Sequence, residues 1–404
     1  MIENQPPVTT HELADGVFVD EVVTVDSPDH LSDILGAATA SNETVIPFGG
    51  RRSLATGNPA GSARWGADLT GLRGIISYEP ADLTLSVLAG TTMNEIRDVL
   101  AEAGQELPLD VPFPGDTTIG GLVATGFAGP RRLRSGSLRD LLIGCEFVRG
   151  DGLLAKAGGM VVKNVSGFEI PRFLHGSWGA LAVLTSVNLK VTPVARADGS
   201  LTAEFDDVDV AIAAALGIIA GEPSIESCVV TINGNGVKVA VRAMGRIGAV
   251  AAMLDSFGKA LGSTTDRIEA ETSRDYWQAL VNDYAEDPSR IVISMSTRPR
   301  DIHVLTRQFN EIGTRCGAEI LVSPGLGSLR IRLPGAHQQA AGCASDILGA
   351  AARLNVRCVL ESAPLPLRSA VSTWGADPEG IDLMRSVKRQ FDPANVLNPG
   401  RLFL

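Results

Sequence analysis

The first half of the chain alternates apolar segments at strand spacing with apolar segments at helix spacing. Apolar residues recur at helix spacing within 31–40, and the short β-branched run 44–46 follows them. Thr92 and Glu95 form a Ser/Thr-x-x-Glu capping box, and the apolar positions after it predict a helix. Further strands are predicted at 84–88, 143–148, 153–157 and 181–191, with a hairpin turn at 149–152.

After residue 196 one pattern occurs twice. Each copy is a strand, a helix, a hairpin of two strands and a second helix. The first copy takes the ranges 201–204, 208–219, 228–232, 237–244 and 247–261. The second copy takes the ranges 291–296, 302–316, 320–323, 328–333 and 337–352. Two such units predict a second α+β domain, in which helices cover one face of an antiparallel sheet.

The end of the chain predicts a helix at 382–390 and then an irregular loop at 395–401. So specific a loop at a terminus indicates that the segment docks back onto the body of the protein. We therefore expect three parts: a first domain over 18–195, a second over 196–370, and a returning C-terminal segment over 371–404.

Composition narrows the classes of protein. The chain has 404 residues, 45% of them hydrophobic and 20% charged, and two soluble domains are expected. Its net charge of −11 and the lack of a Lys/Arg run argue against nucleic acid as a partner. No apolar run of about 18 residues predicts a membrane span. Peripheral attachment through a partner, at the inner face of the cell membrane, stays open.

Five cysteines are scattered along the chain, without a CxxC pair or zinc spacing. Such a pattern predicts reduced thiols in a cytoplasmic protein. Cys145, in a predicted strand, is expected to be a small core residue.

Glycine is unusually frequent, with 44 residues in the chain. Three glycine-rich stretches, at 47–54, 114–126 and 163–181, adjoin predicted strands in the first half. Unobstructed backbone N–H groups suit a pyrophosphate, and small residues let the backbone lie against a flat ring system. Any one stretch alone is more typical of a turn, but three together indicate a binding site. None matches the Rossmann GxGxxG pattern or the P-loop.

These stretches resemble the FAD-binding half of the vanillyl-alcohol-oxidase/PCMH flavoprotein superfamily. The resemblance rests on Pro-Gly and Thr-Ile-Gly-Gly within 114–121, Lys-Asn-Val-x-Gly-Phe at 163–168, Gly-Ser-x-Gly-x-Leu at 176–181, Leu-Lys-Val-x-Pro at 189–193, and the tail 391–402. It implies an α+β fold, namely a PCMH-type two-subdomain FAD-binding domain followed by an α+β cap domain with an antiparallel sheet.

The resemblance also implies which residues hold FAD. Attachment is expected to be non-covalent, because Arg51 and Arg52 stand where covalently flavinylated relatives have a histidine. The residues implied are Pro47, Gly49, Gly50, Arg51, Arg52, Ser53, Leu54, Pro114, Gly115, Asp116, Thr118, Ile119, Gly120, Gly121, Ala124, Gly126, Arg139, Lys163, Asn164, Gly167, Phe168, Gly179, Ala180, Leu181 and Asn398.

Within the superfamily, the chain resembles the FAD-binding subunits of bacterial glycolate oxidases. The marks are Gly-Pro-Arg-Arg at 129–132, Arg139-Asp140, and Asn-Pro-Gly-Arg at 398–401. This resemblance implies a complex with a homologous catalytic flavoprotein subunit and an iron–sulfur subunit, which together oxidise glycolate to glyoxylate. A small 2-hydroxy acid would then be handled through the complex.

Stand-alone relatives that oxidise 2-hydroxy acids carry cap histidines for a metal and a Glu-His-Gly stretch. The five histidines of this chain, His11, His30, His175, His303 and His337, are not paired at ligand spacing, and Glu361 is followed by Ser362. We therefore expect no metal and no catalytic residue here, and an electron-transferring role. The alternatives are an independent FAD oxidoreductase acting on an unknown alcohol, or a scaffold that has lost FAD.

Several residues leave two interpretations open. His175 and Trp178 are expected to pack structurally, with direct flavin contact as the alternative for His175. Arg131, Arg132 and Arg134 are expected on a surface for the partner subunit, with neutralisation of the FAD phosphates or a substrate carboxylate as the alternative. Arg139 is expected to neutralise the FAD phosphates or a substrate carboxylate.

Overall fold

The N-terminal domain begins with a small mixed sheet and one helix. The structure, a computed structural model, describes residues 10–160, 168–262, 264–285, 287, 289–335 and 338–403. Four strands pair in the order β1 (His11–Ala14), β2 (Val17–Thr24), β4 (Ala63–Asp68) and β3 (Val45–Phe48). The helix α1 (Pro28–Ser41) packs Leu31 and Leu35 against this sheet's core, as the apolar spacing predicts.

A second, antiparallel sheet completes the N-terminal domain. Its strands are ordered β5 (Ile75–Glu79), β6 (Thr84–Leu88), β10 (Ala182–Lys190), β8 (Leu142–Arg149) and β9 (Leu154–Gly158). The predicted capping box opens α2 (Met93–Glu102), whose Met93, Ile96 and Leu100 are fully buried. Smaller elements are β7 (Gln105–Glu106), α3 (Ile119–Thr125), α4 (Arg132–Ser135), α5 (Leu138–Leu141), α6 (Ile170–Leu174) and β11 (Thr192–Pro193).

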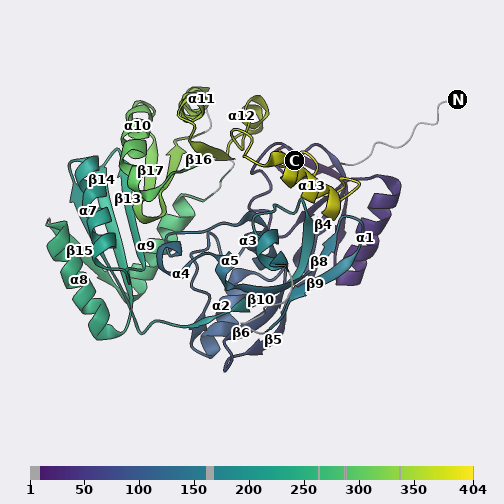
Figure 1. Cartoon of the computed structure of the whole chain (residues 1–404), viewed down its shortest axis with the longest axis horizontal. Coiled ribbons are helices and arrows are strands. Elements are labelled where there is room, and N and C mark those ends of the chain that lie inside the picture. Colours follow the sequence, from purple (N-terminus) through teal and green to yellow (C-terminus); the bar gives the residue numbers. More distant parts are fainter. Residues whose placement is uncertain are drawn as a thin grey trace.

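The cap is one antiparallel sheet of eight strands, built from two copies of one unit (Figure 1). The first copy contains β12 (Ala197–Phe205), α7 (Val208–Gly221), β13 (Ser227–Asn233), β14 (Gly236–Gly245), α8 (Ile247–Leu261) and β15 (Thr265–Glu269). The second contains β16 (Ile291–Ser296), α10 (Ile302–Arg315), β17 (Glu319–Ser323), β18 (Ser328–Leu333), α11 (Gln338–Arg353) and β19 (Arg357–Ser362). The strand order is β15-β12-β14-β13-β17-β18-β16-β19. The strands of the second copy thus follow one another across the sheet in the reverse order of their equivalents in the first, which confirms the predicted repeat.

One helix of the cap departs from the prediction that helices cover a single face. The four helices α7, α8, α10 and α11 share one core on the predicted face. The helix α9 (Ala270–Asp283) instead lies on the opposite face, where Trp277 is buried against Val229 and Ala240. It also faces the N-terminal domain, since Gln278 donates to the Val111 carbonyl (2.9 Å) and Asn282 accepts from the Phe113 N–H (2.9 Å).

Two arginines join the domains through buried ion pairs. The Arg131 guanidinium contacts Glu106 of the N-terminal domain (2.9 Å) and Glu226 of the cap (2.6 Å). It is 7% exposed, so the prediction that Arg131 lies on a partner-facing surface is wrong. Arg242 of the cap is paired with Asp198 (2.6 Å) and lies 3.8 Å from Asp110 of the N-terminal domain.

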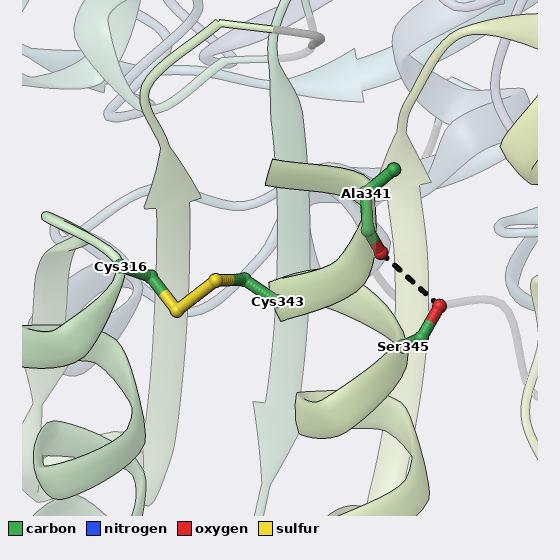
Figure 2. The surroundings of a disulfide bond; sticks show 4 residues. All are labelled: Cys316, Ala341, Cys343 and Ser345. Carbon is green, nitrogen blue, oxygen red and sulfur yellow. Dashed lines mark hydrogen bonds between the residues drawn. A yellow bond between two sulfur atoms is a disulfide. The ribbon is translucent and has the colours of Figure 1, made fainter. Parts of the chain in front are cut away.

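Two of the five cysteines form a disulfide, contrary to the prediction of reduced thiols. Cys316, at the end of α10, is bonded to Cys343 in α11 (Figure 2). The bond links two neighbouring helices on the outer side of the cap. The cysteines therefore no longer support the prediction of a cytoplasmic protein, which rested on reduced thiols. Cys145 is buried as predicted, and burial raises the pKa of its thiol to about 12.

The C-terminal segment returns to the N-terminal domain (Figure 1). It comprises α12 (Leu365–Ala370), α13 (Ile381–Phe391) and the loop after it. Val45 of β3 donates to the Val396 carbonyl (2.8 Å), and the Asn398 N–H donates to the Val45 carbonyl (3.0 Å). The predicted docking of the tail is therefore confirmed. Among the described residues, no helix has the length and apolar character needed to cross a membrane.

Candidate functional site

The first and second glycine-rich loops lie against each other at the end of β3. A Cβ on Gly49 would stand 2.5 Å from the Thr118 hydroxyl oxygen, and one on Gly50 would stand 1.6 Å from the Asp116 carbonyl oxygen. Glycine is thus required here because the loops approach so closely. Thr118 caps the start of α3 through the Gly121 N–H, which fixes the second loop.

Together with the tail and the start of β10, these loops enclose a cleft, which we call the loop cleft. Many predicted residues line it: Pro47, Gly49, Gly50, Arg51, Arg52, Ser53, Leu54, Asp116, Thr118, Gly120, Gly121, Ala124, Gly179 and Asn398. Three segments far apart in sequence are therefore brought to one site, and the tail supplies a fourth.

Other predicted residues lie elsewhere. Ile119, Ala180 and Leu181 are buried behind the wall, and Pro114 and Gly115 belong to the second loop without lining the cleft. Phe168 is 91% exposed, Arg139 is also exposed, and Gly126 lines a second cavity. Lys163, Asn164 and Gly167 lie outside the described residues.

Sequence reasoning missed part of the lining. Trp178 and Arg401 also line the loop cleft. The aliphatic lining residues that were not predicted are Leu69, Ala89, Leu122, Ala182, Val183 and Leu184. Arg401 follows Asn398 within the same tail motif, so that motif could have indicated it. Leu69 and Ala89 directly follow strands, Leu122 lies in α3 and the other three lie in β10, and none carries a local signal of ligand contact.

The chemistry of the loop cleft fits a flavin dinucleotide. The N–H groups of Gly50 and Arg51 make no hydrogen bond within the described parts of the chain, which leaves two backbone donors at the cleft for a phosphate. The buried amide oxygen of Asn398 likewise has no partner among the described residues, and its amide nitrogen donates to the Trp178 carbonyl (2.9 Å). Small and aliphatic residues on the opposite wall suit a flat ring.

Aromatic rings hold the cationic side chains of the loop cleft. The Arg51 guanidinium lies 4.7 Å above the Phe48 ring, and that of Arg52 lies 3.8 Å above Phe113. Arg401 lies 5.3 Å above Trp178 and donates to the Ser53 carbonyl, so it links the tail to the first loop. These contacts fix positive charge beside the two free backbone donors, as an anionic cofactor requires.

A second cavity of about 430 Å³, the cap cavity, lies between the N-terminal domain and the cap. Thr125, Phe127 and Trp178 line both spaces, so the cap cavity adjoins the loop cleft. Its cap side includes Glu361, whose carboxylate is paired with Arg330 at 2.8 Å. No group of three or more His, Cys, Asp or Glu side chains able to hold a metal occurs among the described residues.

His175 lines the cap cavity and not the loop cleft. Its Nε2 atom is buried and has no hydrogen-bond partner in the described part of the chain. Burial lowers the pKa of His175, the positive charge of Arg139 lowers it further, and Asp140 acts in the opposite direction. The ring is therefore neutral at pH 7. Trp178 packs edge-on against Trp374, with ring centroids 5.3 Å apart.

Comparison with known proteins agrees with this geometry. Residues 19–168 match the family described as "FAD binding domain", and residues 368–402 match "FAD linked oxidases, C-terminal domain". Two separate parts of the chain are therefore similar to FAD-linked oxidases. The chain's cofactor is FAD, and that family is one of FAD-dependent oxidoreductases.

The curated relatives add detail. The chain is 44% identical to glycolate oxidase subunit GlcE of Escherichia coli over 134 residues, which are 33% of this chain and only 38% of that subunit. It is 25% identical to glycolate oxidase subunit GlcD of Bacillus subtilis over 422 aligned residues, covering 95% of this chain and 89% of that one. A D-lactate dehydrogenase of Archaeoglobus fulgidus is 30% identical over 197 residues, 48% of this chain and 43% of that one.

A solved structure shares the whole architecture. An alkyldihydroxyacetonephosphate synthase superposes with a TM-score of 0.69 at 15% identity, covering 95% of this chain and 76% of that one. At this identity the likeness concerns the fold alone. It agrees with the PCMH-type arrangement of an FAD-binding domain followed by an α+β cap.

Proposed function

We propose that this chain is the FAD-binding, electron-transferring subunit of a glycolate oxidase complex that oxidises glycolate to glyoxylate. In this proposal FAD is bound non-covalently in the loop cleft. The hydroxy-acid chemistry takes place mainly on a homologous flavoprotein subunit, and an iron–sulfur subunit completes the complex. The complex would work on the cytoplasmic side of the cell, at the inner face of the membrane.

The observation that carries the proposal is the pairing of Glu361 with Arg330 in the cap cavity. A 2-hydroxy acid needs a base for its hydroxyl proton and a cation for its carboxylate. Glu361 stands at the position of the Glu-His-Gly stretch of the stand-alone relatives, but no histidine follows it. Its carboxylate forms an ion pair with Arg330. The loop cleft, by contrast, retains donors for a dinucleotide. This chain is thus better equipped to hold a flavin than to deprotonate an alcohol.

Within the proposal, each wall of the loop cleft has its own task. The N–H groups of Gly50 and Arg51 would bind the pyrophosphate, and Asn398 would accept a hydrogen bond from a cofactor N–H or hydroxyl. The small residues of α3 would lie along the ring. Bound FAD would accept two electrons and pass them on one at a time. The protein residues would orient the cofactor and exclude water.

The test is the absorption spectrum of the purified chain, followed before and after acid precipitation. We expect a flavin band that leaves with the supernatant, because the attachment is non-covalent. Glycolate should bleach this band only when the partner subunits are present. Bleaching by glycolate in the isolated chain would overturn the division of labour, and a colourless protein that takes up no added FAD would favour the scaffold.

A further inference from the structure

Trp374 contacts two residues of the loop cleft from behind. It lies in the C-terminal segment between α12 and α13 and does not itself line the cleft. Its ring packs edge-on against Trp178 of the third glycine-rich stretch, with ring centroids 5.3 Å apart. Its indole N–H donates to the carbonyl of Arg401 (2.8 Å). Because Trp178 and Arg401 both line the loop cleft, Trp374 supports its wall from outside.

The surroundings of Trp374 also include the chain that follows the first glycine-rich loop. A Cβ on Gly57 would stand 2.7 Å from the Trp374 ring, so the ring lies directly against the backbone there. The hydroxyl of the neighbouring Thr373 donates to the side-chain oxygen of Asn58 (2.7 Å), and the Thr373 carbonyl accepts the N–H of Leu360 in β19 (2.7 Å). Residues 373–374 therefore join the last strand of the cap to the loop cleft.

Trp178 needs support because its backbone is strained. Its φ is +54°, in a region that bulky side chains rarely adopt and that persists only where surrounding contacts hold it. The Trp178 N–H donates to the Ala124 carbonyl (2.8 Å), and its carbonyl accepts from the side-chain amide of Asn398 (2.9 Å). These bonds fix the backbone, whereas the ring is held by Arg401 above it (5.3 Å) and by Trp374.

Arg401 is the second lining residue that Trp374 holds. The Arg401 side chain donates to the Ser53 carbonyl of the first loop, and its own carbonyl accepts the indole N–H of Trp374. Further along the tail, Phe403 packs edge-on against Trp374, with ring centroids 6.4 Å apart. Trp374 thus fixes the end of the tail next to the loop cleft.

We propose that Trp374 is a positioning residue for FAD, which acts through Trp178 and Arg401 and makes no contact with the cofactor. Its removal frees the Trp178 ring and the backbone of Arg401, so this wall of the cleft has to become ordered when FAD binds. Ordering on binding lowers affinity, because it costs conformational entropy. This inference rests on the proposed binding of FAD in the loop cleft and adds a residue that prepares that site.

The experiment is titration of the full-length, cofactor-free chain with FAD, with circular dichroism of the flavin bands measured at saturating FAD. Trp374→Leu should raise the FAD dissociation constant about tenfold, because the wall is no longer held in place. Its flavin circular dichroism should differ from that of the wild type, because this signal reports how the protein surrounds the bound ring. Trp374→Phe keeps an edge-on ring but lacks the N–H donor, so both effects should be smaller.

Trp65→Leu is the matched control. Trp65 is also half-buried, and its indole N–H donates to Glu43 (2.7 Å), but it does not line the loop cleft. This variant should lose stability in urea unfolding, as Trp374→Leu does. It should keep the wild-type FAD dissociation constant and the wild-type flavin circular dichroism.

A double-mutant cycle tests whether Trp374 acts through Trp178. In a chain that already carries Trp178→Leu, the change Trp374→Leu should raise the FAD dissociation constant no more than about threefold, because the ring that Trp374 holds is absent. The remaining effect belongs to Arg401. Simple addition of the two single effects would show that Trp374 does not act through Trp178, and the proposal would then be wrong.

Two further results would overturn the proposal. One is a folded Trp374→Leu chain with lower stability but with the dissociation constant and flavin circular dichroism of the wild type. The other is an equal loss of FAD affinity in Trp65→Leu. If Trp374→Leu does not fold, Trp374→Phe decides the question by the same two measurements. A wild-type chain that takes up no FAD would overturn the proposed function as well, whereas unchanged FAD binding in the variants overturns this inference alone.

Discussion

Lys388 of α13 is a buried cation that holds the C-terminal segment against the loop cleft. Its ammonium group donates to the carbonyls of Ala180 (2.8 Å) and Leu397 (3.1 Å), and it is paired with Asp392. Asp392 in turn accepts the N–H groups of Val396 and Leu397. Burial lowers the pKa of Lys388, and the charge of Asp392 opposes this shift. Asn398 and Arg401 follow directly after this anchored stretch.

Lys388→Met should therefore weaken both the fold and FAD binding. Removal of one partner from a buried ion pair leaves Asp392 uncompensated, which costs about 3–5 kcal/mol of the free energy of unfolding. FAD affinity should fall because the tail carries Asn398 and Arg401 to the cleft. Urea unfolding and titration with FAD measure the two effects.

Lys156→Met is the control for this variant. Lys156 is also paired with a glutamate, Glu146, but its side chain is 76% exposed. Its removal should leave the free energy of unfolding nearly unchanged, because an exposed ion pair contributes little to stability. If Lys388→Met lowered stability but left the FAD dissociation constant unchanged, the tail would not depend on this anchor for its role at the cleft.

His175 should make stability fall as the pH drops below about 6.5. Burial is the main cause that lowers its folded pKa, whereas the unfolded histidine titrates near its ordinary value of about 6.5. Below that value the unfolded chain binds the extra proton, so acidification favours unfolding, and stability rises again with pH up to about 6.5.

A variant that lacks only His175 tests this dependence. We expect His175→Asn to show a smaller loss of unfolding free energy from pH 7 to pH 5 than the wild type. His303→Asn, which removes an exposed histidine of α10, should keep the wild-type loss. If the unfolding free energy of wild type and of His175→Asn changed equally with pH, His175 would bind a proton as readily in the folded chain as in the unfolded chain.

At the scale of elements, the loop cleft depends on contact between the first two glycine-rich loops. Gly50 lies so close to the Asp116 carbonyl that a methyl group cannot fit without moving one loop. Gly50→Ala should therefore raise the FAD dissociation constant at least about tenfold, because it displaces the free N–H groups of Gly50 and Arg51. Gly61→Ala adds a methyl group where no atom lies within 4 Å, and FAD titration should find it neutral.

The helices α1 and α2, the strands β3, β6, β8, β9 and β10, and the predicted elements of both cap repeats follow from local pattern, whereas β1, β2, β4 and β5 were not predicted. Period-2 and period-3.6 spacing placed the strands and helices of both cap repeats, because each buries one face. The loops were found because glycine, hydroxyl and cationic residues occur together within short stretches. The helix α9 was missed, although Ser273, Trp277, Leu280 and Tyr284 recur at helix spacing, because charged residues lie between them.

Features that depend on the meeting of distant segments could not be predicted. The cap cavity takes Ser294, Arg330 and Arg357 from three strands, with no motif in any of them. The Cys316–Cys343 bond depends on α10 and α11 lying side by side, which spacing along the chain does not reveal. Arg131 was assigned to the surface because its partners, Glu106 and Glu226, lie in separate domains.

At the scale of the whole molecule, a buried network of charged residues connects the N-terminal domain with the cap. Arg131 lies between Glu106 and Glu226, and its backbone N–H donates to the buried Asp110 carboxylate (2.6 Å). Burial raises the pKa of Asp110, while the hydrogen bond and charge of Arg131 and the charge of Arg242 oppose the shift. Pro130 and Arg132, the neighbours of Arg131 in sequence, line the cap cavity, whose two sides belong to different domains.

Arg131→Met should loosen this interface more than it loosens either domain. Glu226 would be left buried without a counter-charge, at a cost of about 3–5 kcal/mol. Hydrogen exchange should become faster at the interface segments 106–113 and 223–226, while β10 and β13 keep their protection. The double change Arg131→Met with Glu226→Gln should restore part of the lost stability, since it removes the unpaired buried charge.

Arg64→Met is the control, because the ion pairs of Arg64 lie within one domain at the surface. It should change hydrogen exchange only locally. Uniformly faster exchange in β10 and β13 of Arg131→Met would instead assign Arg131 to the stability of the domains themselves, and the cap cavity would then owe its shape to other contacts.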